Sequence, residues 1–224
     1  MSIHRCATLR RRHGPALAAT VSAVAALAAV PTARAQDRAD SGPAPAPITY
    51  TILPAASVLE VHSYKAGLLA GLGHEHVIRA HAFAGTVVHD ARDPSRSSVA
   101  LTVLTDSLRV VPAADSADIP AITKAMREHV LHVAEFPEIS FASTDVTVRG
   151  DTVHLRGDLT MVGVTRPVEL DLTLDATPEV LHVSGSFTVK QTDFGIHPYS
   201  AGLGTVKVKD EVAFRLDLRA VAAR

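Results

Sequence analysis

The sequence predicts an all-β protein, an antiparallel meander of eight or nine strands with one short α-helix. The clearest evidence is the run 168–175, in which every second residue is aliphatic and the residues between them are acidic or polar. A period of two gives a strand one apolar face and one wet face, as in an antiparallel sheet that covers a core or a cavity. Turn residues such as Gly150 and Asp151 separate several runs of this kind. The stretch 118–133 differs, because its apolar residues recur at helical spacing.

The first 35 residues have the outline of a secretory signal peptide. Arginines 10–12 form a basic start, residues 15–30 are apolar and nearly uncharged, and Ala33 and Ala35 precede an expected cleavage site before Gln36. The apolar run is shorter than the roughly 20 residues that span a membrane, so we expect export and cleavage, with no membrane span left afterwards.

Residues 36–47 are rich in Pro and Ala and are predicted to be a linker, and residues 48–224 are predicted to be the folded domain. Without its first 35 residues, which hold five arginines and no acid, the chain carries 17 basic and 23 acidic side chains, a net charge of −6 with histidine neutral. This charge disfavours nucleic acid as a partner. Cys6 is the one cysteine, so the exported protein would have no disulfide.

The elements follow in order from residue 48. The expected strands are 48–53, 58–64, 74–89 with a bend near Gly85, 99–108, three runs between 138 and 175, 180–189, and 205–221. Turns are expected at Gly163 and over 165–167. The helix can begin at Asp118, with Pro120 in its first turn. A single short helix of this kind is expected near one mouth of a barrel.

Several segments of this chain resemble the YceI-like family. The segments are 135–141, with the sequence EFPEISF, and the more specific 157–168, with the sequence GDLTMVGVTRPV; 193–196 and 208–212 match the closing segments of the family. The resemblance spans residues 48–221. It implies a lipocalin-like antiparallel β-barrel of about eight strands, located in the periplasm, that holds an isoprenoid or other long-chain amphiphile. It implies no catalytic residue and no cofactor. Because some relatives form dimers, a homodimer is a possible assembly of this chain.

The inward faces of the strands are apolar and suit a hydrocarbon ligand. An eight-stranded barrel is wide enough for one slender ligand, and each buried CH₂ group contributes about 0.8 kcal/mol. The alternative is that the same side chains fill a dry core. Ten residues are predicted to line the interior: Ile139, Phe141, Leu155, Leu159, Leu170, Leu172, Phe187, Val189, Phe214 and Leu216.

The histidines suggest a second function. His74 and His76 would point to the same side of a strand, so that with His62, His81 or His197 as a third ligand they could bind Zn²⁺ or Cu²⁺. The protein would then be a periplasmic metal-binding or stress-response protein. If Ile78, on the same side, faces the barrel interior, the two histidines would instead contact a ligand head group at the mouth, with a pH dependence near 6.5. Exposed surface composition also explains such a pair. No serine-hydrolase, phosphate-loop or dinucleotide motif occurs, so an enzyme is not expected.

Overall fold

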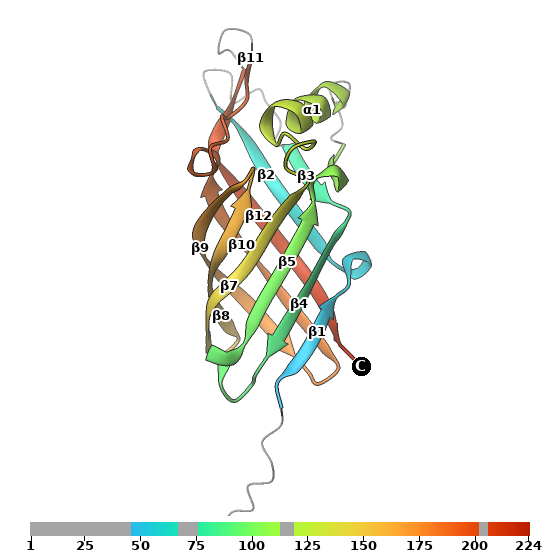
Figure 1. The fold of residues 1–224 in the computed structure, drawn as a ribbon, viewed down its shortest axis with the longest axis vertical. Coiled ribbons are helices and arrows are strands. Elements are labelled where there is room, and N and C mark those ends of the chain that lie inside the picture. The colour runs from blue at the N-terminus through green and yellow to red at the C-terminus, as the bar shows by residue number, and fades with distance from the viewer. Residues whose placement is uncertain (1–45, 67–75, 113–118, 202–205) are drawn as a thin grey trace, which may run out of the picture. The chain divides into compact units, whose positions relative to one another are not determined.

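The structure, a computed structural model, describes residues 46–66, 76–112, 119–201 and 206–224. The predicted signal peptide (1–35) and nearly all of the predicted linker lie outside the described residues. The described chain forms a closed antiparallel β-barrel with one short helix at one end (Figure 1), which confirms the predicted fold class. The strands are β1 (Ile48–Ile52), β2 (Val58–Ala66), β3 (His76–Ala80), β4 (Phe83–His89), β5 (Ser98–Leu104), β6 (Leu108–Val110), β7 (Glu138–Arg149), β8 (Thr152–Met161), β9 (Val164–Ala176), β10 (Val180–Lys190), β11 (Ser200–Ala201) and β12 (Val206–Ala222).

The ring of hydrogen-bonded strands runs β1-β4-β5-β7-β8-β9-β10-β12 and closes where β1 pairs with β12. Towards the end of the barrel that carries the helix, β2 continues along β12 where β1 stops, and β3 and β6 extend the wall in the same way. The pairs β1 and β2, β3 and β4, and β5 and β6 are therefore interrupted strands. Counted in this way, eight strands form an up-and-down meander, which abolishes exposed sheet edges around the ring.

Two interruptions differ from the expected strand bounds. The predicted strand 74–89 breaks at His81 and Ala82 and not at Gly85, and the predicted strand 99–108 breaks at a 3-10 turn, Thr105–Ser107. The two breaks lie side by side, since the Ala82 carbonyl accepts hydrogen bonds from the Leu104 N–H (3.0 Å) and the Ser107 hydroxyl (3.1 Å). The turns therefore satisfy the backbone groups that the ladder leaves free.

The turn expected over 165–167 was placed wrongly, because these residues belong to β9. The β8–β9 turn consists of Val162 (φ 49°) and Gly163 (φ 72°), and positive φ at both central residues is the geometry of a two-residue hairpin. Pro167 is accommodated in β9 because this strand pairs with β10 only over Leu172–Ala176. Proline has no N–H to donate, so it suits the half of a strand that lacks this ladder.

The helix is shorter than the predicted 118–133. It comprises α1 (Ile119–Ala125) followed by one π-helical turn, Met126–Val130, and Asp118 lies outside the described residues. Arg127 joins this element to the barrel by pairing with the carboxylate of Asp106, whose carbonyl also accepts from Arg127 Nη1 at 3.1 Å. The hydrogen bond from Arg127 holds the pKa of Asp106 below its usual value. Among the described helices, none is both long and apolar enough to cross a bilayer.

An ion pair between the buried Glu60 of β2 and the exposed Arg79 of β3 gives a prediction about acid stability. Glu60 lies opposite Arg79 in the ladder and accepts a hydrogen bond from Arg79 Nε at 2.9 Å, with His62 Nε2 3.4 Å from its other oxygen. Burial by itself would raise the pKa of Glu60, but the hydrogen bonds and charges of Arg79 and His62 outweigh it, so the pKa is lowered. The ionised pair therefore contributes stability above the unfolded pKa of about 4.3, and this contribution is lost as the pH falls through the folded pKa.

We expect Arg79→Met to lower the melting temperature at pH 7 and to cost progressively less below about pH 4, where Glu60 is protonated in the parent protein too. Thermal melts of both proteins between pH 3 and pH 7 measure this difference. Arg156→Met is the matched control, because Arg156 and Glu169 form an exposed pair at 2.9 Å that contributes little. A deficit for Arg79→Met that is the same at every pH would contradict the assignment.

Candidate functional site

The interior of the barrel holds an apolar cavity of about 120 Å³, here called the lower cavity. It is lined mainly by side chains of the ring strands, together with Leu59 of β2 and Ser97, and its 27 lining residues include no Asp, Glu, Lys or Arg. The interior is therefore not a completely filled core. Nine of the ten predicted lining residues surround this cavity: Ile139, Phe141, Leu155, Leu159, Leu170, Leu172, Phe187, Phe214 and Leu216. The tenth, Val189, is buried in a neighbouring apolar cluster and lines neither this cavity nor the one described next.

A second cavity of about 420 Å³, the upper cavity, lies between the helix and the extended end of the wall. Its volume falls within the range of small-molecule sites. Side chains of α1 and the π-helical turn, such as Ile122 and Met126, form its apolar cover. Ile139 and Phe214 line both cavities, so the two adjoin there, and the Phe214 ring stacks on Phe187 with 4.8 Å between ring centroids. A ligand that passes these side chains would reach both spaces.

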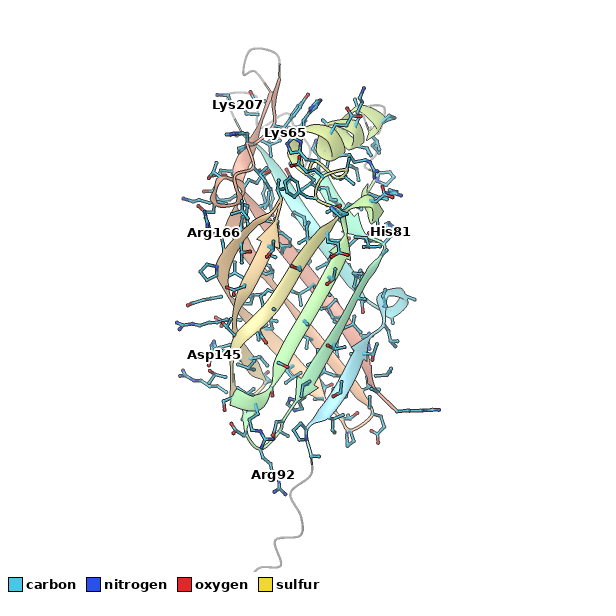
Figure 2. The ribbon with its side chains drawn as sticks, viewed as in Figure 1. Lys65, His81, Arg92, Asp145, Arg166 and Lys207 are labelled. Atoms are coloured by element: carbon cyan, nitrogen blue, oxygen red, sulfur yellow. The ribbon has the colours of Figure 1, made fainter. Side chains whose placement is uncertain are left out.

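The upper cavity differs chemically from the lower one because one part of its wall is polar. Ser63 of β2 and His76 of β3 are cross-strand partners, and Lys65 follows Ser63 on the same face of β2. We call these three residues the polar corner. Gln191 and Tyr199 contribute further polar groups from the chain between β10 and β12. The polar corner lies at the end of the barrel that carries the helix, where Figure 2 labels Lys65.

A β-bulge in β12 shapes the wall beside the polar corner. Val208 pairs with Lys65 and Val212 pairs with Ser63, so three residues of β12 oppose Tyr64 alone. A bulge bends its strand and redirects side chains, and here Val208 and Val212 both line the upper cavity. Lys209, inside the bulge, places its ammonium 5.9 Å from the ring centroid of Tyr64. The bulge therefore separates a lysine that lines the cavity, Lys65, from one that stacks on an exposed tyrosine.

The predicted histidine site is only partly covered by the structure. His76 and Ile78 line the upper cavity, while His74 lies outside the described residues. Of the three suggested third ligands, His81 and His197 are exposed and His62 is buried beside Glu60. Within the described ranges, no three His, Cys, Asp or Glu side chains lie close enough together to hold a metal ion. The described residues thus supply no support for the alternative of a metal-binding protein.

Sequence reasoning missed Ser63, Lys65 and Gln191. For β2 a signal existed, since Leu59, Val61, Ser63 and Lys65 alternate and must share one face. Because Leu59 lines the lower cavity and Val61 the upper one, the same face carries Ser63 and Lys65 inward at the end of the strand. For Gln191, which donates to the Lys209 carbonyl at 2.8 Å from a 3-10 turn, we find no comparable signal.

Comparison with known proteins gives consistent matches. The sequence model of the YceI-like domain matches residues 50–220. The curated protein YceI of Salmonella arizonae and that of Salmonella newport are each 35% identical to the chain over 92 residues, which are 41% of this chain and 45% of theirs. The chain thus spans less than half the length of these curated relatives.

Solved structures share the fold. BcnA of Burkholderia cenocepacia superposes with a TM-score of 0.61 at 17% identity, over 75% of this chain and 98% of BcnA. The Campylobacter jejuni YCEI protein gives a TM-score of 0.54 at 12% identity, over 66% of this chain and 85% of the other. At such identities the likeness concerns the fold alone.

Proposed function

This chain belongs to the YceI-like family, and from that premise we propose that it binds an amphiphilic lipid, a polyisoprenoid or a similar long-chain molecule, inside the barrel. The observation that carries the proposal is the pair of adjoining cavities, a smaller lower one whose described lining has no Asp, Glu, Lys or Arg and a larger upper one with a polar corner. An amphiphile has the same two parts. Its tail would occupy the lower cavity, and its head group would lie beneath the helix.

Burial of the tail would supply most of the affinity. Each CH₂ group transferred from water contributes about 0.8 kcal/mol, and the predicted lining residues would contact the tail along the barrel. The lining offers few polar groups that could distinguish one tail from another. The volume of the cavity would therefore determine which tail lengths and shapes bind. Such a protein would act by sequestering or carrying its ligand and not by catalysis.

The location proposed for this activity is the periplasm. The outline of residues 1–35, with its basic start, apolar run and small residues before Gln36, supports export. A lipid carrier in an aqueous compartment shields a tail that would otherwise be exposed to water, which is the thermodynamic reason for such a cavity.

Native mass spectrometry of the protein isolated from its own periplasm tests the proposal. We expect a co-purifying lipid, seen as a defined mass difference between native and denatured spectra and identified after organic extraction. Metal analysis of the same sample is the control. Stoichiometric zinc or copper without lipid would overturn the proposal, and so would a protein that carries no lipid and binds none when long-chain probes are added.

A further inference from the structure

We propose that the head group of the ligand is an anion, a carboxylate or a phosphate, and that Lys65 is the side chain that binds it. The inference rests on the proposed function and adds the charge of the ligand, its orientation and the residue that recognises it. It is carried by the position of Lys65 in the upper cavity and by the charges around it.

Lys65 is a half-buried cation in a largely apolar cavity. In the described part of the chain, no carboxylate lies within ion-pair distance of its ammonium. Two arginines near this end do have partners, since Arg79 pairs with Glu60 and Arg127 with Asp106. A cation that loses water without a partner costs free energy, so this position favours a ligand that brings the negative charge.

Among the described residues that line the cavity around Lys65, none carries a negative charge. Its 20 lining residues include no Asp or Glu, although the whole chain has a net charge of −1. Asp210 is two residues from the lining residue Val208, but its carboxylate is turned towards Thr192. It accepts hydrogen bonds from the Thr192 N–H at 2.9 Å and from the Thr192 hydroxyl at 2.7 Å. The positive charge of this described lining therefore results from the placement of single residues and not from the overall composition.

The groups beside Lys65 suit an oxyanion. Ser63 and Tyr199 line the same cavity. Their hydroxyls are hydrogen-bond donors, and the Lys65 ammonium can supply a charge-assisted hydrogen bond. A lysine acts as a point charge that accepts either carboxylate or phosphate geometry, so the two share one recognition chemistry. With its head at Lys65, the ligand would lie with its tail running past Ile139 and Phe214 into the lower cavity.

Three probes with one tail and different head groups test the inference: farnesol, farnesoic acid and farnesyl phosphate. Their affinities are measured at pH 7.5 by displacement of N-phenyl-1-naphthylamine, an uncharged fluorescent probe. We expect the full-length exported protein to bind at least one of the two anions roughly tenfold or more tightly than farnesol. Lys65→Met should remove this preference and leave the affinity for farnesol within about twofold, whereas Lys65→Arg should retain the preference.

Lys207→Met is the matched control, because Lys207 is an exposed lysine at the same end of the barrel (Figure 2) and lines neither cavity. It should leave the anion preference unchanged. Equal binding of all three probes by the parent protein would overturn the inference and leave lipid binding standing. A Lys65→Met protein that still prefers the anions would overturn the role of Lys65. If none of the probes, farnesol included, binds, the proposed function itself fails. A preference between the two anions identifies the head group as a carboxylate or a phosphate and supports the inference.

Discussion

Replacing Val148 and Val153 together by phenylalanine is expected to weaken the binding of a long-chain amphiphile by more than about 100-fold while the barrel stays folded. The two residues are cross-strand partners on β7 and β8, and both line the lower cavity. Two phenyl rings placed side by side would occupy space that the tail needs. Because the rings fill an existing cavity of about 120 Å³, we expect no large loss of thermal stability.

The magnitude follows from the number of methylene groups that the rings exclude. Exclusion of four CH₂ groups removes about 3 kcal/mol of burial, which corresponds to more than a hundredfold in affinity. Shorter tails lose fewer contacts, so the defect should shrink with tail length. Titration of a series of saturated fatty acids with different chain lengths into the parent protein and the variant measures both effects.

The matched control places the same two substitutions on the outer face of the same strands. Thr147 and His154 are also cross-strand partners and lie between the lining positions, so Thr147→Phe with His154→Phe adds two rings outside the barrel. His154 pairs with Asp171 at the exposed surface, and loss of that contact costs little. Unchanged binding by the inner variant, or equal losses in both variants, would show that tails do not enter the lower cavity.

Gly157→Ala is expected to lower the free energy of unfolding by about 2–3 kcal/mol. Gly157 is buried in β8 between β7 and β9. A Cβ atom there would lie 2.6 Å from the Ala142 carbonyl oxygen and 2.6 Å from Cε2 of the Phe141 ring. The carbonyl belongs to the ladder and cannot move without breaking it. The ring lines the lower cavity, so it would be pushed into the space of the tail.

Thermal unfolding should show this as a fall in melting temperature of about 5–10 °C. Gly150→Ala is the comparison, because Gly150 has φ 64° with nothing within 4 Å of an added Cβ. It should cost only the backbone strain of about 1–2 kcal/mol. The double variant Phe141→Leu with Gly157→Ala should recover part of the loss by removing the ring and leaving the carbonyl clash. A Gly157→Ala protein as stable as its parent would refute the close approach.

The alternation of apolar and polar residues along the strands determined which side chains face the interior of the barrel. The period of two in 168–175 places Leu170 and Leu172 on the same face, and the structure has both in the lining of the lower cavity. The local hairpin β7–β8 pairs strands that are neighbours in sequence, so the turn residues Gly150 and Asp151 were enough to predict it. The family motif at 157–168 also lies within one short segment, so it could be recognised without knowledge of the tertiary structure. These features depend on side chains within a few residues of one another.

Tertiary structure decided where the ring closes, where strands break and what the interior can hold. Closure pairs β1 with β12 across the full length of the domain, and the break at Ala82 exists because a second break beside it satisfies its carbonyl. Alternation shows which side chains share a face, but cavity volume depends on how closely all strands pack around the axis. The role proposed for Lys65 needs the helix, the bulge and β3 around it. The sequence therefore determined which residues face inward, and only the long-range pairing of strands decided that a space remained among them.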